Sequence, residues 1–92
     1  MSSWRTKKLK NLAQVLTAIN NPKDMENFLR DVCTVEELDE MSSRWEIVVL
    51  LSEGKTYRDI ADKTGVSTTT VTRISHWLNN GEGGYKAALK RK

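Results

Sequence analysis

The run WEIVVLL, residues 45–51, limits the possible folds of this 92-residue chain more than any other stretch. Its apolar side chains point to more than one side of a helix, and such a helix must be covered nearly all round. A strand is the competing interpretation, because residues 47–49 are all β-branched. Glu46, Glu53 and the long helical approach favour the helix. Because so short a chain buries only a modest share of its surface, we expect a second copy to cover the run.

The spacing of apolar residues elsewhere predicts a chain that is helical throughout. Apolar residues recur at three- and four-residue intervals over residues 9–19, which places them on one helix face. Asn21 and Pro22 mark the end of this helix and the start of a second, since proline suits the first helical position. The buried stripe of the second helix is expected at Met25, Phe28, Leu29 and Val32.

Capping patterns predict where three further helices begin. Thr34 and Glu37 form a capping box, in which each side chain accepts from the backbone N–H of the other residue. Thr56 and Asp59 repeat the pattern with an aspartate. Ser67 is a natural N-cap for the last long helix.

Residues 56–78 have the features of a helix-turn-helix, two helices joined by a tight turn. Gly65 lies in the turn, where its lack of a side chain permits the positive φ that a sharp turn demands. Ile60 on the first helix and Val71 and Ile74 on the second face inward. The glycine in the turn and the apolar residues on the inward sides predict a hairpin of two packed helices.

The opposite side of the second helix carries Thr68, Thr69 and Thr72. These side chains donate and accept hydrogen bonds, and their methyl groups can contact thymine methyls in the major groove of DNA. Backbone N–H groups in the first turn of this second helix favour a phosphate. Nearby basic residues that would add salt-sensitive phosphate contacts are Lys55, Arg58, Lys63 and Arg73. The pattern predicts DNA binding; the alternative is a helical protein-interaction module in which the hairpin docks a protein partner.

The charge distribution agrees with a polyanionic partner. Residues 1–23 carry five basic and no acidic groups, residues 24–53 carry two and nine, and residues 54–92 carry eight and three. The total is +3, but the basic ends and not the acidic middle are expected to meet a polyanion. A solvated surface with uneven charge is the alternative.

Several other classes of protein are disfavoured. The single cysteine, Cys33, rules out an intrachain disulfide and fits a reducing compartment. One cysteine and one histidine without paired spacing cannot supply a structural zinc site. No apolar run reaches the roughly 18 residues of a membrane span and no signal-peptide pattern opens the chain, so we expect a cytoplasmic protein. We expect no enzymatic activity, because neither paired carboxylates nor a nucleophile with its base is visible.

These patterns together predict one all-α domain over residues 1–92. Its expected parts are dimerisation helices over residues 5–53, the helix-turn-helix over 56–78, a glycine-rich loop over 79–84 and a basic tail over 85–92. The loop, NNGEGG, lacks the lysine and the serine or threonine that a nucleotide-binding loop would need.

The stretch SRWEIVVLLSEGKTYRDIADKTGVSTTTVTRI resembles the tryptophan repressor superfamily. FLRDVCTVEEL and NNGEGGYKAAL resemble its Trp-repressor-related bacterial branch. The resemblance covers about residues 8–89 and is strongest over residues 43–80. It implies an all-α, intertwined homodimer with interlocked N-terminal helices, whose helix-turn-helix binds double-stranded operator DNA to regulate transcription. Such a dimer agrees with the second copy that we expect to cover the apolar residues 45–51.

The resemblance also assigns residues by position. Its DNA-facing residues fall on Arg58, Ser67, Thr68, Thr69 and Thr72. Two arginines that sandwich the corepressor ring in the repressor fall on Arg44 and Arg73. The alternatives are that Arg44 pairs with Glu40 or Glu46 on its own helix, and that Arg73 holds a DNA phosphate.

The chain departs from the repressor beside the expected ligand cavity. Ile74 stands where the repressor has glycine, and Trp45 where it has a smaller aliphatic residue. Both changes add volume, which opposes the binding of an indole. We therefore expect DNA binding that needs no ligand, and the alternatives are L-tryptophan or another small corepressor.

Overall fold

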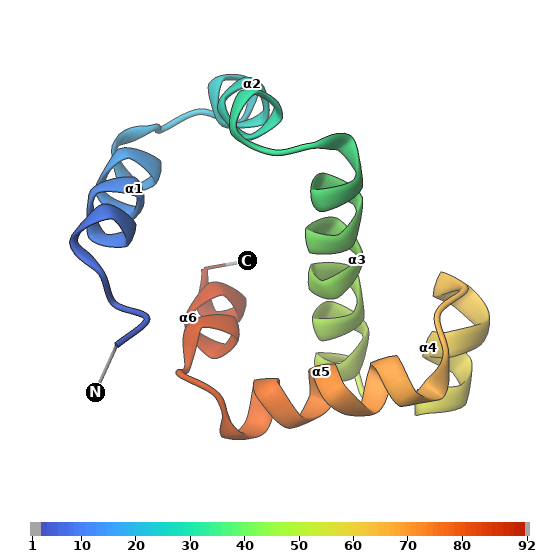
Figure 1. Ribbon diagram of the computed structural model, residues 1–92. Helices are drawn as coiled ribbons and strands as arrows, with labels where there is room; N and C mark the ends of the chain where they lie inside the picture. The colour runs from blue at the N-terminus through green and yellow to red at the C-terminus, as the bar shows by residue number, and fades with distance from the viewer. Residues whose placement is uncertain (1–2, 92) are drawn as a thin grey trace. The chain divides into compact units, whose positions relative to one another are not determined.

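A computed structural model describes residues 3–91 of the chain. Its helices are α1 (Lys7–Ala18), α2 (Pro22–Val32), α3 (Val35–Ser52), α4 (Tyr57–Thr64), α5 (Thr68–Asn80) and α6 (Gly84–Lys90) (Figure 1). No strand occurs within residues 3–91, so the predicted all-α class is confirmed and the strand interpretation of residues 45–51 is wrong. None of the helices described has both the length and the apolar character that crossing a bilayer requires.

The chain divides into two compact units, Met1–Leu38 and Asp39–Lys92, with the boundary inside α3. The first unit holds α1, α2 and the start of α3, and the second holds the rest of α3 and α4 to α6. A single domain over residues 1–92 stays a prediction, because each unit is compact by itself.

The second helix of the first unit begins where Asn21 and Pro22 predict, and both helices of this unit remain largely exposed. The Asn21 side chain accepts from the backbone N–H of Asp24, and Pro22 is the first residue of α2, as predicted. No residue of α1 or α2 is buried. Val32, expected in a buried stripe, is 54% exposed, and the other three residues of that stripe are only half-buried. The predicted burial is not reached in one chain, because this unit has too few helices to enclose an interior.

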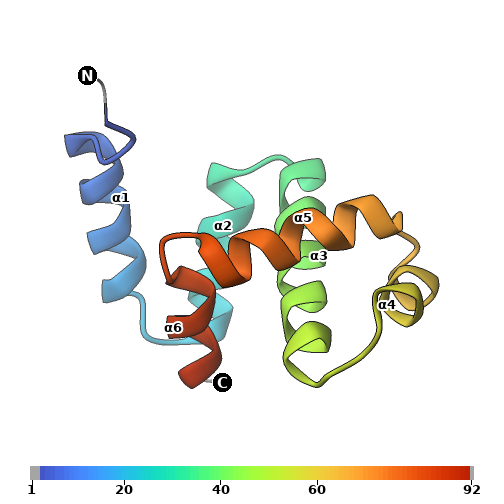
Figure 2. The same ribbon diagram turned by 90° about the horizontal axis from the view of Figure 1, so that it is seen from below.

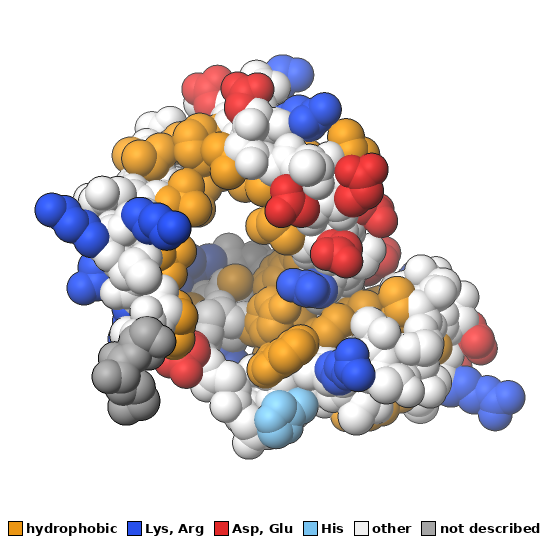
Figure 3. Space-filling model, viewed as in Figure 1, with side chains coloured by type: hydrophobic (Ala, Val, Ile, Leu, Met, Phe, Trp, Pro, Cys, Tyr) orange, Lys and Arg blue, Asp and Glu red, His pale blue; other side chains and the backbone are white. Residues whose placement is uncertain are grey.

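The predicted capping box at the start of α3 is confirmed. The Thr34 hydroxyl accepts from the backbone N–H of Glu37 at 3.0 Å, and the Glu37 carboxylate accepts from that of Thr34 at 2.8 Å. Acidic side chains then follow the exposed side of α3 (Figure 3), which matches the acidic middle of the sequence.

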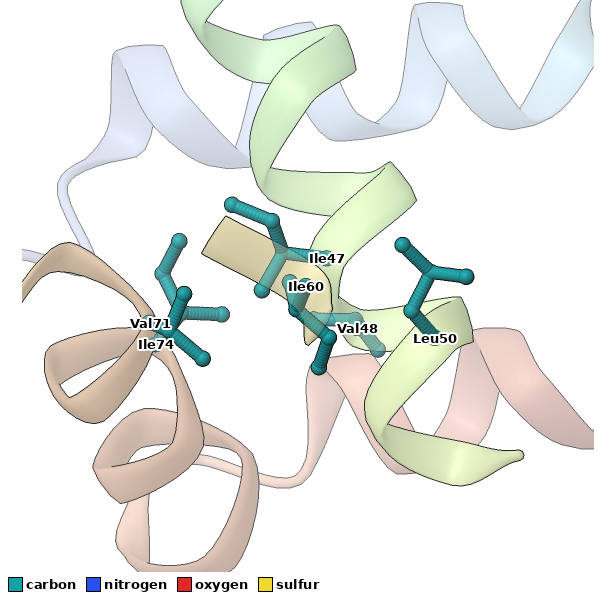
Figure 4. Packing of buried hydrophobic residues seen from close by; sticks show 6 residues of the cluster. All are labelled: Ile47, Val48, Leu50, Ile60, Val71 and Ile74. Carbon is teal, nitrogen blue, oxygen red and sulfur yellow. The ribbon is translucent and has the colours of Figure 1, made fainter. Parts of the chain in front are cut away.

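The core lies in the second unit, where α5 crosses the C-terminal half of α3 (Figures 1 and 2). Its buried side chains, none more than 6% exposed, are Ile47, Val48, Leu50, Ile60, Val71 and Ile74 (Figure 4). Three of these belong to the apolar run of α3, so the chain's own α4 and α5 bury much of that run. Trp45, Val49 and Leu51 of the run are only half-buried, so the expectation that a second copy covers the run stays a prediction.

Residues 84–90, nearly all of them within the expected basic tail, form the helix α6. Tyr85 and Leu89 lie four residues apart, on one side of this helix, and pack against the core. The basic residues Lys86, Lys90 and Arg91 are exposed. The last residue of the expected tail, Lys92, lies outside the described residues.

Candidate nucleic-acid interface

The helix-turn-helix predicted at residues 56–78 is present as α4, a turn and α5. The Thr56 hydroxyl accepts from the backbone N–H of Asp59 at 3.1 Å and so caps α4. Gly65 ends α4 with φ +81°, and its N–H donates to the Ala61 carbonyl at 2.9 Å. The positive φ predicted for Gly65 is confirmed, and it turns the chain sharply into α5.

The inward side of the hairpin is closed by three residues predicted to lie there. Ile60 of α4 and Val71 and Ile74 of α5 point into the same apolar cluster (Figure 4). Each is at most 2% exposed. Because this cluster also includes side chains of α3, the inward side of the hairpin packs against α3.

The N-terminal turn of α5 is capped and exposed. The Ser67 hydroxyl accepts from the backbone N–H of Thr70 at 3.1 Å, which commits the Ser67 side chain to the cap. Thr68, Thr69 and Thr72 are exposed, as predicted. The Thr72 hydroxyl donates to the Thr68 carbonyl at 2.9 Å, so toward a ligand it offers an acceptor and a methyl group. Within residues 3–91 the hydroxyl of Thr69 has no hydrogen-bond partner, which leaves it available to a ligand.

The two arginines predicted to contact DNA lie in different surroundings. Arg58, in the first turn of α4, is exposed. Arg73, on α5, is exposed too but lines a cavity between α5 and α3. Arg73 therefore lines the cavity and is also exposed on α5, so its position fits both of its predicted roles, ligand binding and DNA binding.

This cavity has a volume of about 420 Å³ and brings Arg44 of α3 and Arg73 of α5 together in its lining. Carboxylates of Asp39 and Glu40 line it on the α3 side. The rest of its lining is formed by apolar side chains, Ile74 among them, and by the hydroxyl-bearing Ser43 and Thr70. Figure 3 shows basic, acidic and apolar side chains close together where α3 meets α5.

The interpretation in which Arg44 pairs on its own helix is not supported. Among the described residues, Arg44 makes no hydrogen bond or ion pair with Glu40, Glu46 or any other side chain. A guanidinium with no protein partner beside a cavity retains its donors for a ligand or for water.

The lining of the cavity differs from expectation at Trp45, Thr70 and Trp77. Trp45 does not line it but packs half-buried against the core. Trp77 lines it instead, with 52% of its surface exposed, and so does Thr70. Neither Thr70 nor Trp77 was predicted to line the cavity, although residues 70, 73, 74 and 77 share one helix face by their spacing.

Comparisons with known proteins give the same fold and family. Residues 7–92 match the family model described as Trp repressor protein. The chain is 39% identical over 85 residues to the protein YerC of Bacillus subtilis (strain 168), an alignment that covers 89% of this chain and 82% of YerC. It is 36% identical over 78 residues to the Trp operon repressor homolog of Chlamydia caviae, covering 84% of this chain and 77% of that protein.

A solved structure is similar as well. The crystal structure of a TrpR like protein from Eubacterium eligens ATCC 27750 matches with a TM-score of 0.87 and 37% identity, covering 95% of this chain and 90% of that chain. Trp repressor proteins are regulatory DNA-binding proteins and not enzymes, in agreement with the function class predicted from the sequence. The family match spans nearly the whole chain and two of its relatives are more than 35% identical to it. This chain therefore belongs to the Trp repressor family.

Proposed function

We propose that the chain is a sequence-specific regulator of transcription that binds double-stranded DNA as a homodimer. The observation that carries this proposal is the N-terminal turn of α5, which exposes Thr68, Thr69 and Thr72 while the opposite side of the helix is held in the core. A helix mounted in this way can enter the major groove, and its first N–H groups favour a phosphate. A two-fold dimer would match an approximately palindromic operator with half-sites about one helical turn apart.

Exposed apolar side chains support the homodimer. The large apolar residues with 45% or more of their surface exposed on α1, α2 and α3 are Val15, Val32, Val35 and Met41. Apolar surface concentrated on a few elements is typical of a protein interface. A second copy of this chain is the partner that the family and the interlocked helices implied by the resemblance favour.

Substitutions in the α5 turn and in α4 test the proposed DNA binding. Thr69→Asp places a carboxylate near the N-terminus of α5, where it stabilises the helix but repels phosphate. We expect it to lower the affinity for DNA selected from a random pool at least about tenfold. Arg58→Ala should weaken binding less and reduce the salt slope by about one unit. Fluorescence anisotropy titrations at two salt concentrations measure both effects.

Ser52→Asp, which adds the same negative charge at an exposed position at the C-terminal end of α3, is the matched control and should bind nearly as well as the parent. If Thr69→Asp and Arg58→Ala both bind DNA like the parent, the proposed interface is wrong. The protein-docking alternative would then explain the exposed threonines better.

We further propose that DNA binding needs no bound ligand. The apolar cluster already holds α5 on α3, with Ile74 only 2% exposed, so no ligand is needed to join the two helices. Calorimetry with L-tryptophan should give no heat of binding, and L-tryptophan should not change the affinity for DNA. Heat with the parent that disappears in Arg44→Ala would instead establish a corepressor bound in the cavity that Arg44 and Arg73 line.

A further inference from the structure

We propose that Tyr57, Ser75 and Asn79 form a positioning cluster that fixes the start of α4 against the middle of α5. This inference rests on the proposed DNA-binding function, since the cluster would set where Arg58 lies relative to the threonines of α5. The cluster was not expected from the sequence, where Tyr57 is simply a residue after an N-cap.

The cluster joins two helices through side-chain hydrogen bonds. Tyr57 is the first residue of α4, and its hydroxyl donates to Ser75 Oγ on α5 at 2.6 Å, across 18 positions in the sequence. Asn79 Nδ2 donates to the Ser75 carbonyl at 2.9 Å and lies 3.4 Å from Ser75 Oγ. Because a carbonyl only accepts, the amide nitrogen of Asn79 must face Ser75.

Because Ser75 is buried, its hydroxyl needs partners within the protein in place of water. Ser75 is 7% exposed and lies on the inward side of α5 beside Ile74. Leaving a buried hydroxyl without a partner costs free energy, because the group has lost its hydrogen bonds to water. Among the described residues no buried side-chain nitrogen or oxygen lacks a partner, so Tyr57 and Asn79 satisfy Ser75.

The hydrogen bonds of this cluster fix the orientation of α4 relative to α5, which apolar packing alone does not. Apolar contacts of Ile60 with the core hold α4 close to α5, but the hydrophobic effect is non-directional. A short hydrogen bond constrains both distance and angle. Tyr57 is 41% exposed, so the residue is not held in place by burial, and its hydrogen bond acts one position before Arg58.

A double-mutant cycle on DNA affinity tests the cluster in the intact chain. Tyr57→Phe and Ser75→Ala should each weaken DNA binding about 3- to 10-fold, the effect of losing one net hydrogen bond. The double variant should bind no more weakly than the weaker single variant, because both remove the same interaction. All titrations are made where circular dichroism shows each variant to be fully folded, so a purely structural role would leave the affinity unchanged.

Losses that add in the double variant would mean that the Tyr57 hydroxyl contacts DNA directly, and they would overturn the proposal. Unchanged affinity in both single variants would overturn it too. Tyr85→Phe is the matched control, because Tyr85 is half-buried but has no hydroxyl partner among the described residues. It should bind DNA like the parent.

Amide hydrogen exchange without DNA separates this inference from the proposed function. Tyr57→Phe should speed the exchange of α4 amides several-fold and leave the buried amides of Ile47 and Val48 in α3 unchanged. Unchanged exchange in α4 contradicts the cluster even when the parent binds DNA. A parent that binds no DNA contradicts the proposed function, while faster exchange in α4 still supports the hydrogen-bonded contact between the helices.

Discussion

Gly65 is the residue on which the turn between α4 and α5 depends. Its φ of +81° lies in the left-handed region, which residues other than glycine rarely adopt. A Cβ added there would meet nothing within 4 Å, so the cost of a substitution is conformational and not steric. This makes the position a test of backbone strain alone.

Gly65→Ala should lower the free energy of unfolding by about 1–2 kcal/mol, the cost of forcing an alanine into the left-handed region. Gly84→Ala is the control, since Gly84 is the first residue of α6, has an ordinary φ and also has no atom within 4 Å of an added Cβ. It should be neutral or slightly stabilising. Urea denaturation followed by circular dichroism measures both, and equal values for the two variants would contradict the role given to the turn.

Single residues were predictable from the sequence where their role is local. The caps at Thr34 and Ser67 depend on residues three positions away, so the sequence states both partners. Trp77 and Ser75 were missed, because their surroundings come from α3 and α4. Neither residue's neighbours could be known before the crossing of the helices was known.

Among the helices, α6 shows the same limit at a larger scale. Besides two alanines, its sequence offers one pair of large apolar side chains, Tyr85 and Leu89, which is too little to predict an amphipathic helix. The helix becomes stable because both residues pack on a core built by α3 and α5. Tertiary packing, more than propensity, decides such a short helix.

Leu89→Ala should therefore lower the free energy of unfolding by about 1–2 kcal/mol, somewhat less than the cost at a fully buried leucine. Lys86→Ala, an exposed change on the same helix, should stay within about 0.5 kcal/mol of the parent. Denaturant titrations of the two variants compare them directly. If Leu89→Ala is as stable as Lys86→Ala, α6 contributes no packing energy and the segment behaves as a tail.

Across the whole molecule, burial is divided unevenly between the two units. Every buried side chain among the described residues belongs to the unit Asp39–Lys92, and the helices of the first unit bury none. The apolar surface that one chain leaves open is the basis of the proposed dimer.

Val32→Lys tests that dimer, because Val32 on α2 is 54% exposed in the single chain. The change should cost a lone chain less than about 0.5 kcal/mol, but a lysine buried against a second copy should raise the dimer dissociation constant at least about tenfold. Sedimentation velocity over a dilution series measures this constant. Ser52→Lys, at an exposed position at the C-terminal end of α3, is the control for added charge, and identical sedimentation of both variants would remove α2 from the proposed interface.

The core that α4 and α5 form with α3 is complete within one chain, which has a genetic consequence for the proposed dimer. A copy that carries Thr69→Asp should still fold and pair with a normal copy. Each mixed dimer would bind only one of the two half-sites. A cell that expresses both alleles should therefore lose more regulation than the share of mutant protein alone would predict.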